Sequence, residues 1–166
     1  MSQRDYALKW LFYSIASLLI VALQSLVFNH ITLWGIHLFL LPLVVALATM
    51  WEGYEGLIFS LVFGLLTDLT TTGPIPCFYT LAFFVVAVGT MLIVKHLIVP
   101  GFFCAIITSI LSIILCDLLQ IVFLSYTAGI SLLSGLLLMA KELISVVCMP
   151  LIYFPFRWLH SRVQTD

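Results

Sequence analysis

The chain has 166 residues, of which 64% are hydrophobic and only 8% are charged, and its formal net charge is −1. A soluble domain is about 25% charged, so this chain lacks the polar surface that would cover a water-soluble core, and lipid is the expected solvent for most of it. The charge balance excludes the basic footprint that a nucleic-acid partner needs, and the length leaves no room for a soluble catalytic domain.

Six apolar segments are predicted, and together they form a single polytopic membrane domain over residues 1–166. A transmembrane helix needs about 20 mainly apolar residues to cross roughly 30 Å of hydrocarbon. Arg4 and Lys9 before the first apolar run are also typical of a signal peptide. The run is longer than the apolar core (h-region) of a signal peptide, so we expect it to remain uncleaved. The six segments cover residues 9–28, 36–50, 56–69, 77–94, 102–124 and 130–153.

Turn signals separate these segments. The second segment is short and contains Pro42, which predicts a kink or a locally thinned bilayer. A tight turn follows at residues 51–56, and the clearest loop is the Thr-Gly-Pro run at residues 70–76. The fourth segment ends at Lys95-His96, and the fifth turns at residues 126–129.

The basic residues give the segments an orientation. Five basic residues precede or begin the first segment, or follow the fourth or sixth segment, so with six spans they all lie on one side of the membrane. They are Arg4, Lys9, Lys95, Arg157 and Arg162. Lys and Arg are enriched in cytoplasmic loops. We therefore expect both termini in the cytoplasm and the Thr-Gly-Pro loop outside.

The third segment carries a stripe of small residues with a carboxylate at each end, at Glu52, Gly56, Ser60, Gly64 and Asp68. A spacing of four places these residues on nearly the same helix face. Small side chains at this spacing let a second helix approach closely. We predict a helix-packing face, with packing inside the chain favoured over contact with another membrane protein.

Asp68 lies near the outer end of this segment, just before the Thr-rich turn. Its carboxylate is either partly hydrated or bonded to the hydroxyl of Thr70, Thr71 or Thr72. A role in holding the loop is favoured over a catalytic one.

Ionisable residues also fall deeper in the fifth and sixth segments. We predict that Asp117 pairs with Lys141, or shares a hydrogen-bonded network with Gln120, because the turn at 126–129 places them at similar depth. Glu142 is about 100° around the helix from Lys141 and is protonated, paired elsewhere or facing a polar cavity. A structural ion pair is favoured over a substrate or proton site.

Other reactive residue types give no catalytic, cofactor or metal signature, so a non-enzymatic protein is expected. The cysteines Cys77, Cys104, Cys116 and Cys148 lack a CxxC spacing and are interpreted as packing residues. His30, His37, His96 and His160 lack a ligand spacing. The sequence contains no phosphate loop, HExxH or GxSxG motif.

Three runs carry a family resemblance, namely Gly56-Leu57-Ile58-Phe59-Ser60, Phe63-Gly64-Leu65-Leu66-Thr67-Asp68-Leu69 and Gly73-Pro74 ahead of an apolar helix. With Pro42 before them, they resemble the MreD family of rod shape-determining membrane proteins. The resemblance covers about residues 38–84, and elsewhere it rests on size and hydropathy. The Pro-Ile-Pro-Cys run at 74–77 departs from the Leu-Gly-Leu-like continuation of the family.

The resemblance implies a non-enzymatic scaffold subunit of the bacterial cell-elongation machinery, in the cytoplasmic membrane. Its expected partner is MreC, a single-span protein, in a complex with MreB, RodA and penicillin-binding protein 2. The implied fold is an all-α bundle of six transmembrane helices, similar to the S component of energy-coupling-factor transporters.

That implied fold also supports a rival function, because an S component binds a vitamin and docks on a transporter module. The first segment has Ala16 and Ala22 but no repeated small-residue spacing, which weakens the rival. Asp117, Lys141 and Glu142 keep it open, because a polar pocket would need such groups.

Overall fold

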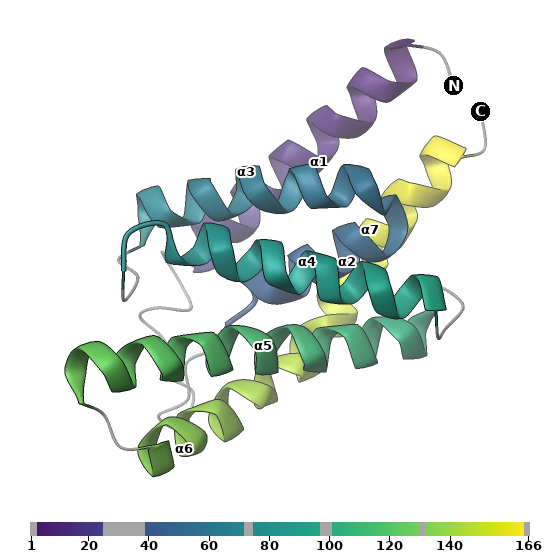
Figure 1. Ribbon diagram of the computed structural model, residues 1–166. Coiled ribbons are helices and arrows are strands. Elements are labelled where there is room, and N and C mark those ends of the chain that lie inside the picture. Colours follow the sequence, from purple (N-terminus) through teal and green to yellow (C-terminus); the bar gives the residue numbers. More distant parts are fainter. Residues whose placement is uncertain (1–2, 25–38, 72–74, 97–100, 130–131, 165–166) are drawn as a thin grey trace.

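The computed structural model describes residues 3–24, 39–71, 75–96, 101–129 and 132–164, and every element in these ranges is helical (Figure 1). The predicted all-α class is confirmed. The elements are α1 (Gln3–Leu23), α2 (Leu41–Glu52), α3 (Tyr54–Thr70), α4 (Phe78–His96), α5 (Phe102–Ala128), α6 (Leu132–Glu142), the 3₁₀ helix η2 (Leu143–Cys148) and α7 (Met149–Gln164).

Three helical stretches are long and apolar enough to cross a membrane, at Phe78–His96, Phe102–Thr127 and Leu133–Trp158. Large apolar side chains such as Phe103 and Leu133 are strongly exposed on them. Such a surface suits lipid rather than water. The chain is therefore a helical membrane protein.

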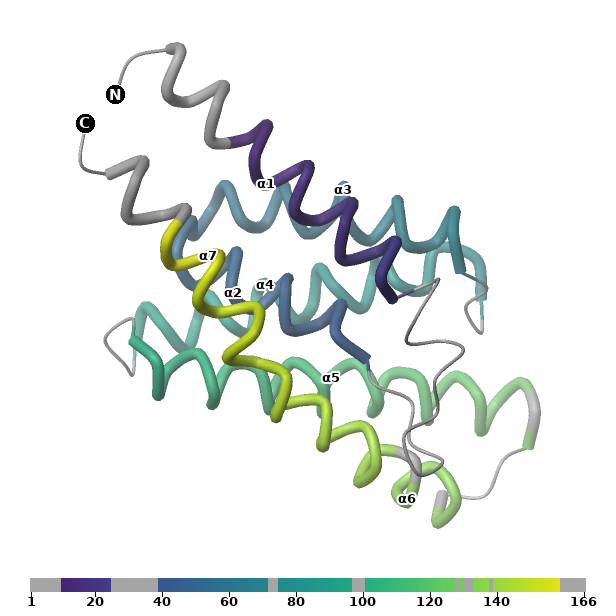
Figure 2. The backbone as a smooth tube through the Cα atoms, turned by 180° about the vertical axis from the view of Figure 1, so that it is seen from behind, coloured from purple at the N-terminus to yellow at the C-terminus, as the bar shows by residue number. Residues whose placement is uncertain are grey.

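α2 lies at the centre of the fold. α3, α4 and α5 lie side by side in one layer (Figure 1), and α1 and α7 cross α2 on the other side (Figure 2). Every residue of α2 from Leu41 to Met50 is buried, as expected for a helix that is apolar on all sides. Its 12 residues give a length of about 18 Å, too short to cross the hydrocarbon alone.

Pro42 lies in the first turn of α2, one residue after its start at Leu41, so of the two predicted alternatives the kink is wrong, and the thinned bilayer stays a prediction. In this turn the missing N–H of Pro42 has no intrahelical acceptor, and its fixed φ is already helical. The chain just before it is anchored by two side chains. The Leu40 amide donates to Gln24 Oε1 at 3.1 Å, and the Phe39 amide donates to Ser145 Oγ at 2.9 Å.

A single residue, Gly53, turns the chain from α2 into α3. Its φ of 55° lies in a region that favours glycine. Glu52 therefore ends α2 and is not part of the predicted stripe on α3. Glu52 Oε1 instead accepts a hydrogen bond from the Tyr13 hydroxyl at 3.2 Å.

The predicted segment 130–153 is three elements, α6, η2 and α7, and the helical chain continues to Gln164. Pro150 explains the 3₁₀ stretch before it, because proline lacks an N–H and its ring clashes with the carbonyl four residues earlier. The fifth segment is longer than predicted and ends where Gly129 adopts a φ of 63°. The connection between the first two predicted segments, residues 29–35, lies outside the described residues.

Candidate functional site

The small-residue face of α3 packs inside the chain. Gly56, Ser60 and Gly64 are buried. A Cβ added to Gly56 would lie 2.6 Å from the Cα of Thr49 in α2, and one added to Gly64 would lie 2.6 Å from the Cα of Thr80 in α4. The face therefore meets two different helices of its own chain and is not open to a partner.

Asp68 caps the start of α4 from the end of α3. Asp68 Oδ1 accepts the Tyr79 amide at 2.9 Å, and Oδ2 accepts the Thr80 amide at 2.9 Å and the Thr80 hydroxyl at 2.7 Å. The first amides of a helix have no intrahelical acceptor, and the helix dipole favours an anion there. The carboxylate thus joins α3 and α4 across the loop that connects them.

The donors to Asp68 differ from those predicted. Thr70 donates its hydroxyl to the carbonyls of Leu66 and Thr67, and Thr71 donates to that of Thr67. A threonine hydroxyl in the last turn of a helix reaches carbonyls one turn back, so these two are already satisfied. Thr72 lies outside the described residues.

In the predicted polar cluster, Asp117 of α5 forms a side-chain hydrogen bond with Glu142 of α6. Lys141 is exposed, so the predicted Asp117–Lys141 pairing is wrong. Consecutive helical residues point about 100° apart, and the residue that faces α5 is Glu142.

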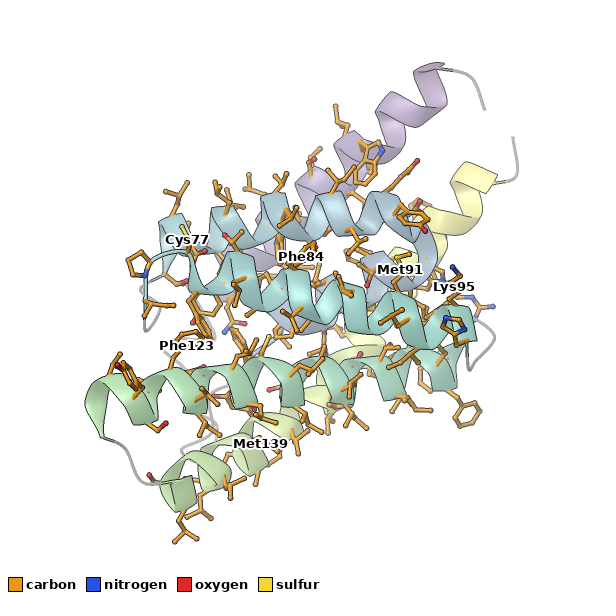
Figure 3. The ribbon with its side chains drawn as sticks, in the orientation of Figure 1. Cys77, Phe84, Met91, Lys95, Phe123 and Met139 are labelled. Atoms are coloured by element: carbon orange, nitrogen blue, oxygen red, sulfur yellow. The ribbon has the colours of Figure 1, made fainter. Side chains whose placement is uncertain are left out.

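A close approach between α5 and α6 explains this choice. A Cβ added to Gly135 would lie 2.8 Å from the Ile121 side chain, so Gly135 marks the α5-facing side of α6. Residues Gly135, Met139 and Glu142 follow the i, i+4, i+7 spacing of one helix face. Met139 lies where α6 approaches α5 (Figure 3). This spacing is the sequence signal that identifies Glu142 as the partner.

A cavity of about 40 Å³ adjoins the carboxyl pair. Ligand pockets for drug-sized molecules have about 300–1,000 Å³, so this space suits water rather than a vitamin. Asp117 is only 5% exposed, and its Oδ2 has no hydrogen-bond partner among the residues that the structure describes. The cavity is lined by Asp117, Gln120, Ile121, Leu124, Gly135, Met139 and Glu142.

The cysteines and histidines form no site in the described ranges. All four cysteines are free thiols. Over the part of the chain that the structure describes, no group of three His, Cys, Asp or Glu residues is arranged to hold a metal ion. His96 is exposed at the end of α4, His30 and His37 lie outside the described residues, and the His160 side chain does too.

An apolar groove of about 260 Å³, which no sequence pattern predicted, runs between α1 and α3. Its α1 wall presents two serines whose hydroxyls are satisfied within the helix. Ser14 donates to the Trp10 carbonyl and Ser17 donates to the Ser14 carbonyl, both at 2.8 Å. The lining residues are Ser14, Ser17, Leu18, Phe59, Val62, Phe63, Leu65 and Leu66.

Aromatic packing supports the groove at one end. The rings of Trp10 and Tyr13 lie 6.2 and 5.9 Å from that of Phe59, and Phe59 stacks on Phe63 at 5.6 Å. Beyond these rings, Val62 and Leu65 of α3 are more than half exposed. The α1 wall contributes Ser14, Ser17 and Leu18, and the α3 wall is entirely apolar. Small side chains such as the two serines allow a second membrane helix to approach closely.

The fold and the composition define an all-helical membrane protein. In comparisons with known proteins, no family model, curated protein or solved structure matches the chain. A more specific function is therefore argued from the groove, the polar cluster and the resemblance of residues 38–84.

A double-mutant cycle distinguishes the two possible partners of Asp117. We expect Asp117→Ala and Lys141→Ala to be additive within about 0.5 kcal/mol in the free energy of unfolding, because Lys141 does not contact Asp117. Asp117→Ala and Glu142→Ala should instead couple by about 1 kcal/mol or more. Unfolding of the purified variants in detergent, followed by circular dichroism, measures both cycles. Coupling to Lys141 alone would contradict the observed pairing.

Proposed function

We propose that this chain is a non-enzymatic scaffold subunit of the MreD type in the bacterial cytoplasmic membrane. Its role is to hold the membrane helix of an MreC-like single-span protein and thereby to position the cell-elongation machinery, with MreB, RodA and penicillin-binding protein 2 as further partners. The resemblance of residues 38–84 to the MreD family suggests the class of partner, and the groove between α1 and α3 suggests where it docks.

The observation that carries the proposal is the groove between α1 and α3. Its lining residues carry no charge, and its two serine hydroxyls are satisfied within α1. A polar ligand would gain few hydrogen bonds there, whereas an apolar helix would gain dispersion contacts along its length. The buried small-residue face of α3 points to α2 and α4 instead, so the groove is the place on α3 that suits a partner helix.

We also propose six membrane crossings with both termini in the cytoplasm, as in the S-component fold. The N-terminal end of α1 and the C-terminal end of α7 lie at the same end of the molecule (Figures 1 and 2). Lys95 lies at that end of α4 (Figure 3). Arg157 is an exposed residue of the C-terminal half of α7. This arrangement supports the orientation that the positive-inside rule predicts.

The rival function, vitamin binding as a transporter S component, has less support. Vitamin binding would require polar groups around a ligand-sized pocket, but the cavity beside Asp117 and Glu142 has only about 40 Å³. A vitamin would need several times that volume. The exposed groove along α3 is the feature that favours a scaffold.

Filling the groove should prevent partner binding. In cells that co-express an MreC-like protein, Val62→Trp is expected to lower the partner recovered with an affinity-tagged chain at least about tenfold, which corresponds to about 1.4 kcal/mol. The indole would occupy the space of an incoming helix. Purification in mild detergent, with partners quantified by mass spectrometry, provides the measurement.

Leu81→Trp is the matched control. Leu81 of α4 is 48% exposed and Val62 is 65% exposed, but Leu81 does not line the groove, so this variant should retain the partner. A photo-cross-linker at Val62, and not at Leu81, should capture it. Full recovery with Val62→Trp would refute the docking place. Recovery of paired ATPases with a transmembrane coupling subunit would instead establish the transporter function.

A further inference from the structure

Asp117 and Glu142 bring two carboxyl groups together between α5 and α6. The two side chains are hydrogen-bonded. An ionised carboxylate can only accept hydrogen bonds, so a hydrogen bond between two carboxyl groups requires a proton on one of them. The pair must therefore hold at least one proton when the helices are packed as observed.

A second, independent feature points to a ligand at the same place. Asp117 Oδ2 is buried and has no partner among the described residues, although Asp117 lines the cavity. Buried polar atoms are almost always hydrogen-bonded, to protein or to ordered water. The cavity has room for a water molecule, and Gln120 lines it as a second polar neighbour.

Two further ionisable groups that interact with Glu142, within the residues that the structure describes, are acids rather than cations. Tyr79 of α4 and Cys116 of α5 both interact electrostatically with Glu142. Each of these groups becomes an anion when it loses a proton, so neither offers a counter-charge to a doubly ionised pair. Such a pair would place two like charges side by side in a medium of low dielectric constant.

In the described part of the chain, the charged residues of α2 and α7 with a recorded contact face elsewhere. Glu52 of α2 accepts the hydroxyl of Tyr13, and Arg157 of α7 lies over the ring of Tyr153 at 6.0 Å. Lys141, next to Glu142 in the chain, is exposed. A proton is therefore the positive charge that fits between the two carboxyl groups.

We propose that Asp117 and Glu142 form a proton-binding site inside the membrane, in which the two carboxyl groups share one proton and a water molecule in the cavity donates to Asp117 Oδ2. On deprotonation the proton leaves to bulk water, and two adjacent anions remain between α5 and α6. Their repulsion would separate the helices at the Gly135–Ile121 contact, so occupancy of the site controls this packing. The proposal does not depend on the scaffold function.

Infrared spectroscopy of the full chain in vesicles of ether-linked phosphatidylcholine, which has no ester carbonyl group, tests this site. At neutral pH the wild-type chain should show the carbonyl band of a protonated carboxyl group, which shifts in D₂O and disappears in alkali. Asp117→Asn and Glu142→Gln should each lower the pH midpoint of this change by at least about one unit, because each removes the carboxylate that holds the shared proton. The double variant should lack the band.

Asp68→Asn is the control, because its side chain accepts hydrogen bonds from three donors of α4 and lies outside the carboxyl pair. This variant should keep the band and its midpoint. Since both amide variants are nearly isosteric with the acids they replace, helix content by circular dichroism confirms that they fold. Three results would overturn the proposal: no protonated band in the wild type, a band that survives the double substitution, or single variants with an unchanged midpoint.

Discussion

Gly64→Ala is expected to lower the free energy of unfolding by about 2–3 kcal/mol, although alanine is the better helix former. The added Cβ would lie 2.6 Å from Thr80 Cα and 2.9 Å from the Tyr79 carbonyl oxygen. Both are backbone atoms, so α3 and α4 must separate rather than a side chain rotate. Denaturant unfolding in detergent, followed by circular dichroism, measures the loss.

Gly89→Ala is a matched control on α4. Its added Cβ would meet only the Leu115 Cδ1 atom, at 3.3 Å, and this methyl group is the end of a flexible side chain. The gain in helix propensity, about 1 kcal/mol, should make this variant neutral or slightly more stable. Equal stabilities for the two alanine variants would show that α3 and α4 do not approach as closely as observed.

Gly64 and Asp68 act on the same residue of α4. Gly64 lets the backbone of Thr80 approach, and Asp68, one turn later, accepts the Thr80 amide and hydroxyl. Two residues of the run that carries the resemblance, residues 63–69, therefore specify how α3 joins α4. Other residues of the same run, Phe63, Leu65 and Leu66, line the groove between α1 and α3, so the groove is the part of this run that is left for the proposed partner.

The sequence was informative about helices and less so about their ends. High hydropathy shows which residues prefer lipid or protein to water, so it predicted the all-helical membrane class and the order of the segments. It does not show local backbone geometry. The turn at Gly53 and the 3₁₀ stretch before Pro150 depend on single dihedral angles and on one missing amide, which an average over many residues cannot resolve.

The polar cluster shows a different limit. Counting residues from the turn gave the correct depth for Asp117 and its partner, because the rise per residue is constant. Depth alone does not distinguish Lys141 from Glu142, since the two differ by about 100° around the helix. Gly135 and Met139 could have decided between them. The groove had no such signal, because it depends on the crossing of α1 and α3, which lie far apart in the chain.

Asp68→Ala is expected to lower the free energy of unfolding by about 3 kcal/mol, because it removes an ionised acceptor from three donors and a hydrogen bond to a charged group contributes about 1.5–3 kcal/mol. Asp68→Asn retains one acceptor oxygen and should lose about half as much. The same unfolding measurement applies. A loss below about 0.5 kcal/mol, the usual range for surface substitutions, would show that the cap is not formed in the membrane.

Thr80→Val and Thr70→Val test which threonine hydroxyl contacts the Asp68 carboxylate. Thr80 donates its hydroxyl to Asp68 at 2.7 Å, whereas Thr70 donates to the Leu66 carbonyl at 3.1 Å. A double-mutant cycle should therefore give a coupling of about 1–2 kcal/mol between Asp68→Ala and Thr80→Val, and almost none with Thr70→Val. The reverse pattern would mean that Asp68 binds the end of its own helix. In that case the carboxylate would not join α3 to α4, and Gly64 alone would specify their contact.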